Sequence, residues 1–152
     1  MERKTILTCF LVCILAAQIG SCSPGDNRKR QEAVDAVRNY NRMLQRTYLE
    51  ADLNLMRNVA TMNEINKLFP LIQALRSVDN VMIAEQKTFE IKKVSARGKS
   101  AYVESEETWT YWWQHRETAE ITKTKQTITY KIRYNLIQEN NSWKVDNLES
   151  VQ

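Results

Sequence analysis

The hydrophobic positions in the first half of the chain recur with the period of a helix. Between about Arg28 and Leu49, apolar or small side chains return every three or four residues, and charged or amide residues fill the positions between them. A helix with 3.6 residues per turn gathers such a set on one face. The stripe consists of Ala33, Val34, Val37, Tyr40, Asn41, Met43, Leu44 and Tyr48. The pattern predicts a long amphipathic helix over about residues 28–49.

A second helical pattern follows. Residues 50–56 predict a shorter helix or a continuation of the first. Thr61 and Glu64 then have the spacing of a capping box, in which each side chain accepts a hydrogen bond from the backbone N–H of the other residue. The stripe after this box consists of Ile65, Leu68, Phe69, Ile72 and Leu75. Pro70 interrupts the stripe and predicts a kink or a restart, because proline lacks an N–H and clashes with the preceding turn.

From about Asn80 the hydrophobic period shortens to two, the period of a strand. Residues 81–94 are strand-like, Gly98 marks a turn, and a strict alternation begins at Ala101. One face of that strand carries Ala101, Val103, Ser105, Glu107, Trp109, Tyr111 and Trp113. The opposite face carries Tyr102, Glu104, Glu106, Thr108, Thr110 and Trp112. We expect the first of these faces to be the covered one.

Two further strands complete this half of the chain. Residues 114–118 predict a turn, and residues 121–138 predict a long strand. Its apolar face carries Ile128, Tyr130, Ile132, Tyr134 and Leu136. Residues 140–141 turn the chain into a last strand that holds Trp143 and Val145. Helices followed by such a meander predict an α+β fold, with N-terminal helices packed on one face of a curved four-stranded antiparallel sheet.

The N-terminal segment, residues 1–21, has the features of a secretory signal peptide. A charged start precedes residues 5–17, which are almost wholly apolar but too few to span a bilayer. The next residues resemble the lipobox of bacterial lipoproteins, in which the signal is cleaved before the cysteine: Ile19-Gly20-Ser21-Cys22. The resemblance implies a membrane anchor of fatty acyl chains such as palmitate on Cys22. Ser23 after it implies the outer membrane, if the envelope is Gram-negative. The alternative is an ordinary cleaved signal that leaves Cys22 free.

The segment after the cysteine is expected to be a tether. Residues 22–29 contain Pro24 and Gly25, which favour a flexible linker, and residues 30–152 are long enough for one domain. The basic run of residues 28–30 has two interpretations. Its side chains would each add about 1 kcal/mol of attraction to anionic headgroups, or they form the solvated end of the linker.

Cysteine, charge and glycine counts narrow the chemistry further. Cys9 and Cys13 lie in the signal, so an acylated Cys22 leaves no cysteine for a disulfide, a thiol nucleophile or a thiolate metal site. Beyond the signal, 20 basic and 17 acidic residues give a net charge of +3, too mild to indicate nucleic-acid binding. The chain has three glycines and therefore no glycine-rich phosphate loop. The only histidine, His115, falls in a polar turn, so we expect no metal site and no cofactor.

The order of the elements resembles the nuclear-transport-factor-2-like superfamily of cone-shaped α+β domains, over about residues 30–151. Four loose motifs are also similar to the IMS domain of plastid-division and cyanobacterial proteins: Tyr48-Leu49-Glu50-Ala51-Asp52, the helix over residues 67–75, Glu107-x-Trp109-x-Tyr111 and Trp143-Lys144-Val145-Asp146. The resemblance implies a conical pocket between the curved sheet and the helices. It implies no particular activity, because the superfamily contains enzymes, ligand binders and interaction modules.

Glu107 is the candidate catalytic residue. The alternation places it on the covered face beside Trp109 and Tyr111, where a partly desolvated carboxylate would serve as a general acid/base. Tyr130 and Tyr134 on the next strand would supply phenol donors nearby. The alternative is a structural carboxylate that is paired with a buried tyrosine or arginine, or that lies at an open rim.

The aromatic residues 109–113 form the candidate binding surface. Trp109 and Tyr111, with Tyr134 on the neighbouring strand, belong to the covered side and would line a pocket. Trp112 points to the outer face. It marks a surface for an envelope protein or a second copy of the chain, or it lies under its own loop or against a neighbouring lysine or arginine.

These observations favour a membrane-anchored lipoprotein of the cell envelope with a non-catalytic, ligand- or protein-binding domain. One alternative is a small-pocket enzyme of the isomerase or hydratase type, with Glu107 as general acid/base and Tyr130 as donor. Another is an envelope assembly factor whose domain serves as a scaffold for other proteins.

Overall fold

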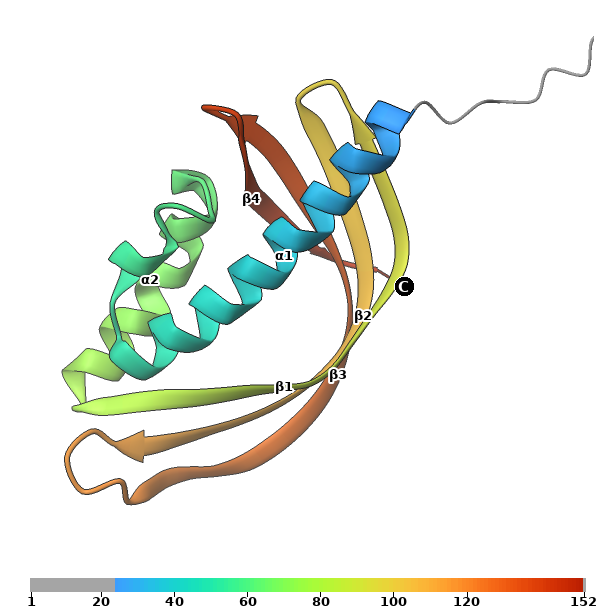
Figure 1. Cartoon of the computed structure of the whole chain (residues 1–152). Coiled ribbons are helices and arrows are strands. Elements are labelled where there is room, and N and C mark those ends of the chain that lie inside the picture. The colour runs from blue at the N-terminus through green and yellow to red at the C-terminus, as the bar shows by residue number, and fades with distance from the viewer. Residues whose placement is uncertain (1–23, 152) are drawn as a thin grey trace, which may run out of the picture.

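The computed structural model describes residues 24–151, which form two helices, a short 3-10 turn and a strongly curved sheet (Figure 1). The predicted signal peptide, the lipobox and Cys22 lie outside the described residues. Within residues 24–151, no helix is long and apolar enough to cross a membrane.

Helix α1 (Pro24–Glu50) confirms the predicted amphipathic helix and begins earlier than expected. The predicted flexible tether is therefore wrong from Pro24 onward. Proline is favourable in the first turn of a helix, because no N–H is needed there and its φ is already helical. Asp26 lies in this turn, where a negative charge complements the helix dipole. Arg28 pairs with Glu32 one turn later at 3.5 Å, which adds further local support.

The segment after α1 is less helical than the pattern predicts. Ala51 takes a left-handed φ of 51° and ends α1, and a single 3-10 turn (Leu53–Met56) follows it. Helix α2 (Met62–Ser77) is then one helix that contains Pro70, so the chain does not restart there. Pro70 is exposed at the surface of this helix.

The predicted capping box at the start of α2 is wrong, although Thr61 is the N-cap residue. The Thr61 hydroxyl instead donates to the Asp146 carboxylate at 2.7 Å. Glu64 is buried and accepts a hydrogen bond from the Tyr40 hydroxyl at 2.8 Å. Both side chains therefore join α2 to other elements, contacts that a local pattern cannot reveal.

Four antiparallel strands follow in the order β1-β2-β3-β4, which confirms the predicted meander. Their bounds are Asn80–Arg97 for β1, Ser100–His115 for β2, Ile121–Glu139 for β3 and Ser142–Ser150 for β4. Left-handed residues make the first and last turns: Gly98 has a φ of 59°, and Asn140 and Asn141 have φ values of 49° and 62°. Register shifts in all three strand pairs mark irregularities of the bulge type, which bend strands.

Both helices lie on the concave side of the sheet (Figure 1). The predicted covered face of β2 is confirmed by the burial of Ala101, Val103, Ser105, Glu107 and Trp109. One apolar cluster lies under α1 and contains Val37, Tyr40, Val103 and Tyr134. A second lies between the end of α1, α2 and the sheet, and contains Tyr48, Ile72, Leu75, Met82 and Trp109.

The first half of β3 departs from the prediction. The alternation places Ile128 on the apolar face, but its side chain is 39% exposed. Strand β4 pairs with β3 only from Ile132 onward, so residues 121–129 extend past β4, and all of them are exposed. Tyr134 and Leu136, further along the strand, are buried as predicted.

Candidate functional site

Glu107 is completely buried on β2, where its carboxylate contacts Asn41 of α1. Its Oε1 atom accepts two hydrogen bonds from hydroxyl groups. Ser105, two residues earlier on the same face, donates at 2.6 Å, and Tyr134 on β3 donates at 2.8 Å. The alternation along β2 and the register with β3 therefore bring the two hydroxyls to one side of the carboxylate.

The other carboxylate oxygen, Oε2, accepts three N–H groups. They come from the Trp109 indole at 2.7 Å, the Gln86 amide at 2.9 Å and the Asn41 amide at 3.3 Å. These donors belong to β2, β1 and α1, so Glu107 joins three elements of the core. Asn41 also accepts from the Tyr134 hydroxyl at 3.1 Å, which closes the network.

All five partners of Glu107 donate, which is the arrangement that stabilises a buried carboxylate. With two donors on Oε1 and three on Oε2, neither oxygen has a lone pair free to accept a proton from a substrate. Tyr130 lies opposite Glu107 in the strand register, but its hydroxyl is not among the donors. The geometry thus favours the structural interpretation of Glu107 and gives no support to a general acid/base pair with Tyr130.

Two buried tyrosines, Tyr40 and Tyr134, each donate a hydrogen bond to a buried carboxylate, Glu64 and Glu107 respectively. Burial raises the pKa of Tyr134 well above its usual value, and the charge of Glu107 raises it further. Burial and then the charge of Glu64 do the same to the pKa of Tyr40. The two rings pack edge to face with their centroids 6.0 Å apart. Both phenols therefore remain neutral donors rather than proton acceptors at neutral pH.

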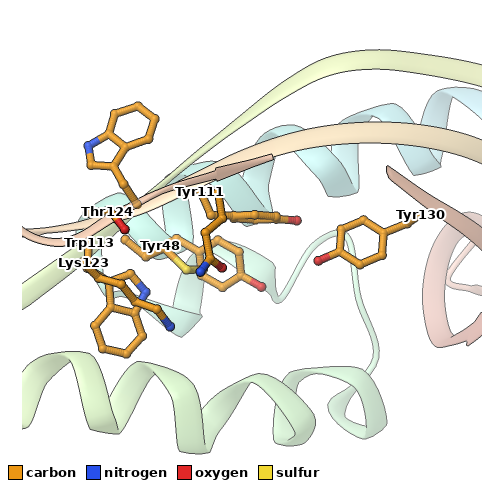
Figure 2. A pocket seen from close by; sticks show the side chains of 9 residues that line it. Tyr48, Tyr111, Trp113, Lys123, Thr124 and Tyr130 are labelled. Atoms are coloured by element: carbon orange, nitrogen blue, oxygen red, sulfur yellow. The ribbon is translucent and has the colours of Figure 1, made fainter. Parts of the chain in front are cut away.

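A pocket of about 300 Å³ opens near the end of α1, beside the β2–β3 turn (Figure 2). We call it the aromatic pocket. Its lining is mostly aromatic, with a few polar groups: Tyr48, Met82, Tyr111, Trp112, Trp113, Lys123, Thr124, Gln126 and Tyr130. In Figure 2 the Tyr130 hydroxyl points toward Tyr111 and Tyr48, and Lys123 lies beside Trp113. Glu107 is not part of this lining.

Contacts between aromatic rings fix the positions of the side chains that line the aromatic pocket. Tyr111 stacks on Trp109 with centroids 6.0 Å apart, and Tyr130 meets Tyr111 edge to face at 6.5 Å. Because Trp109 is itself fixed by its bond to Glu107, the buried network supports the pocket wall. Burial, followed by the neighbouring phenol of Tyr130, raises the pKa of Tyr111, so its hydroxyl stays protonated.

Lys123 supplies the positive charge of the aromatic pocket. Its ammonium lies 4.9 Å from the centre of the Trp113 ring, a cation–π contact. In the described part of the chain it forms no ion pair, so this charge is not neutralised by a carboxylate within 4 Å. The sequence pattern did not identify Lys123, because register shifts next to Trp113 place it opposite that residue.

Trp112 lines part of the pocket but is covered on its other side. The Lys125 ammonium lies 4.1 Å from its ring centre, and the indole N–H donates to Gln114 at 3.1 Å. The stacked-lysine interpretation of Trp112 therefore fits this structure better than an open docking surface. The other three residues predicted to bind a ligand lie in two different places. Tyr111 lines the pocket, whereas Trp109 and Tyr134 donate hydrogen bonds to Glu107.

His115 has a structural place in the β2–β3 turn. Its Nδ1 atom accepts the backbone N–H of Glu117 at 3.3 Å and lies 3.4 Å from that of Thr118, and its Nε2 atom lies 3.7 Å from Asp79. Among the described residues, no three histidine, cysteine, aspartate or glutamate side chains are grouped in a way that could hold a metal ion.

Comparison with solved structures shows which class of fold this is. The chain matches the intermembrane-space region of the chloroplast protein ARC6 with a TM-score of 0.68 at 15% identity, over 80% of this chain and 95% of that one. It matches a ketosteroid isomerase-like protein from Erwinia carotovora atroseptica with a TM-score of 0.52 at 13% identity, over 83% and 98% of the two chains. A nuclear transport factor 2-like protein from Salmonella enterica serovar Typhimurium gives 0.51 at 12% identity, over 83% and 93%.

These similarities establish a nuclear-transport-factor-2-like fold, and at such low identity they establish the fold alone. No protein-family model matches the chain, and no curated protein matches it in sequence. The function must therefore be argued from the site.

Proposed function

We propose that this chain is a membrane-anchored binding module whose ligand occupies the aromatic pocket. The observation that carries the proposal is the combination of five aromatic side chains in the lining with the ammonium of Lys123, which forms no ion pair within residues 24–151. Concave, mostly apolar sites with a few convergent polar groups are typical of ligand binding, and about 300 Å³ is at the small end of their range. The lack of an available carboxylate in the lining favours binding over proton transfer.

The lining also indicates the chemistry of the ligand. Ring faces of Tyr111 and Trp113 favour a flat apolar group, and the phenol of Tyr130 can donate a hydrogen bond. Lys123 favours an anionic group at the same end and disfavours a cationic one. We therefore propose a small aromatic or flat aliphatic group that bears a carboxylate or phosphate, either as a free molecule or on an envelope protein.

The anchor is the second part of the proposal. It is supported by the lipobox-like residues 19–22, which end two positions before α1 begins. Acylation of Cys22 would hold the domain directly at a bilayer. Mass spectrometry of the mature N-terminus tests it: the expected product begins at Cys22 and carries acyl chains, and Cys22→Ser abolishes both the mass increase and the membrane fraction. A free thiol on Cys22 would contradict the anchor.

A matched pair of lysine variants tests the pocket. Lys123→Met removes the charge inside the pocket, whereas Lys125→Met removes the lysine stacked on Trp112. Tryptophan fluorescence would follow titration with aromatic carboxylates and their uncharged amides. We expect carboxylate affinity to fall about ten-fold for Lys123→Met, since one charge-assisted bond is lost, and to change little for Lys125→Met. Equal loss in both variants, or amides that bind as well as carboxylates, would refute the proposed site.

A further inference from the structure

Basic residues from two distant segments meet at the end of the domain where α1 begins. Figure 1 shows the start of α1 beside the β1–β2 turn, and Ala33 of α1 packs in one cluster with Ala96 and Ala101, which flank this turn. The helix contributes Arg28 and Lys29, and the turn contributes Arg97 and Lys99. We call these four residues the basic end. Arg28, Arg97 and Lys99 are exposed, and Lys29 is half-buried.

Little negative charge balances the basic end. In residues 24–151, Arg97 and Lys99 form no ion pair, while Arg28 pairs with the exposed Glu32 at 3.5 Å. Asp26 is the other acidic residue of the first helical turns. The β3–β4 turn points the same way in Figure 1 and is close to neutral, because its Glu139 pairs with Lys144 at 3.1 Å.

Two other surfaces of the domain, the flank of α1 and the end with the β2–β3 turn, lack this excess of positive charge. Along the rest of α1, residues 31–50 carry three acidic and three basic side chains, so its flank has no net charge. At the far end, around the β2–β3 turn, Asp79 lies 3.4 Å from Arg116 and 3.7 Å from His115, and the carboxylates of Glu117 and Glu120 are matched by the ammonium groups of Lys123 and Lys125. The charge distribution therefore runs from a basic end to one in which acidic and basic side chains are close to balanced.

We propose that the domain stands end-on on an anionic membrane surface, with the basic end against the lipid headgroups and the aromatic pocket directed away from the bilayer. This orientation rests on the proposed acylation of Cys22, which lies two residues before α1. The helix start and the β1–β2 turn would touch the surface together. A side-on position would place the flank of α1, which has no net charge, on the headgroups and would gain no such attraction.

The proposal places the aromatic pocket at the end of α1 that is remote from the bilayer. Tyr48 lies 24 positions after Pro24 in one helix, so a rise of 1.5 Å per residue places it about 36 Å further along α1. Each lysine or arginine close to an anionic leaflet adds about a five-fold factor in favour of contact. That attraction acts within a Debye length of about 10 Å, so only side chains at the bilayer surface contribute. The pocket would thus be open to partners in the aqueous compartment.

Energy transfer from the full acylated protein in vesicles tests the orientation. An acylated Cys22 leaves the mature chain without another thiol, so a single dye can be placed by Ser100→Cys beside the basic end or by Thr118→Cys in the β2–β3 turn. Vesicles of phosphatidylcholine containing phosphatidylglycerol would carry an acceptor dye on their headgroups. We expect strong transfer from position 100, weak transfer from position 118, and a smaller difference in pure phosphatidylcholine or at high salt.

A charge-matched pair of variants completes the test. The quadruple substitution Arg28→Gln, Lys29→Gln, Arg97→Gln and Lys99→Gln should bring transfer from the two positions closer together. The control removes four positive charges elsewhere, with Arg38→Gln, Arg42→Gln, Arg46→Gln and Arg116→Gln, and should preserve the difference. Circular dichroism checks that both variants are folded, and a partial set, Arg97→Gln with Lys99→Gln, serves if the full set unfolds.

The outcomes separate this proposal from the anchor itself. Equal transfer from both positions on anionic vesicles, or a difference that the basic-end variant leaves intact, would overturn the orientation alone when mass spectrometry shows an acylated Cys22. An unmodified Cys22 would overturn the anchor and the orientation together. Binding by the aromatic pocket would stand in both cases, because the lysine variants of the pocket measure it independently.

Discussion

Replacing Glu107 by glutamine tests whether this carboxylate is the structural centre of the domain. Glu107→Gln keeps the size of the side chain but removes its charge and turns one acceptor oxygen into a donor NH₂ group. The NH₂ group would face Ser105 and Tyr134, because hydroxyls can rotate to accept, whereas the three N–H donors on Oε2 cannot. The network survives in a weaker form.

The magnitude follows from the five hydrogen bonds. Bonds to a charged group contribute about 1.5–3 kcal/mol each and neutral bonds about 0.5–1.5 kcal/mol, so five weakened bonds cost roughly 5 kcal/mol before any offset. Glutamine is neutral, so the variant avoids the cost of burying a charge, which offsets part of this loss of stability. We expect Glu107→Gln to lower the free energy of unfolding by about 2–4 kcal/mol. Glu107→Ala would cost more, because it leaves all five donors without their acceptor.

Urea unfolding followed by tryptophan fluorescence measures this free energy, with an unchanged m-value as the check for an intact two-state transition. Glu106→Gln is the matched control on the exposed face of the same strand. The Glu106 side chain is 40% exposed and lies 3.9 Å from Lys92, so its replacement should change stability by less than about 0.5 kcal/mol. A Glu107→Gln protein as stable as the wild type, or more stable, would refute the reasoning. A gain in stability is typical of replacing a strained functional residue.

Three further predictions concern other parts of the fold. Burial raises the pKa of Tyr40 and Tyr134, so above about pH 10 each keeps its proton in the folded state, whereas the unfolded chain loses it. The free energy of unfolding should therefore be flat below that pH and then fall by about 1.4 kcal/mol per pH unit for each tyrosine. Urea titrations at alkaline pH measure this slope, and Tyr134→Phe should reduce it. Thr61→Val should lower the melting temperature by breaking the bond to Asp146, at a cost of about 1–2 kcal/mol, whereas Thr61→Ser keeps it; equal stability of the two variants would show that the bond contributes nothing. Gly98→Ala should cost about 1 kcal/mol in calorimetry because of its φ of 59° and not because of crowding, since no atom lies within 4 Å of an added Cβ; an unchanged melting temperature would contradict this.

The sequence predicts the fold well, because the two hydrophobic periods differ clearly between the halves of the chain. The stripe in α1, the alternation in β2 and the asparagine turn at residues 140–141 are local signals, and the structure confirms each of them. The sequence does not reveal the start of α1, because Pro24 and Gly25 favour a linker, although proline is equally suited to the first turn of a helix.

The candidate site was harder to predict because it depends on contacts between elements. Alternation correctly placed Glu107 among covered residues, but its partner Gln86 lies on another strand and Asn41 on a helix that is 66 positions away. Lys123 lies in the pocket because register shifts place it opposite Trp113, and a period-two pattern in the sequence cannot reveal such shifts. The exposed position of Ile128 reflects how short β4 is, and the residues of β3 carry no sign of that.

The central claim, that ligands bind in the aromatic pocket, is tested most directly by the indole N–H signals of the four tryptophans in two-dimensional NMR. The indole of Trp109 is bonded to Glu107 and that of Trp112 to Gln114, so each reports a different part of the domain. During titration with an aromatic carboxylate, we predict a saturable shift of the Trp113 signal that Lys123→Met weakens and Lys125→Met does not. Saturable shifts at Trp112 with Trp113 unchanged, or no saturable shift in any of the four signals, would contradict the account.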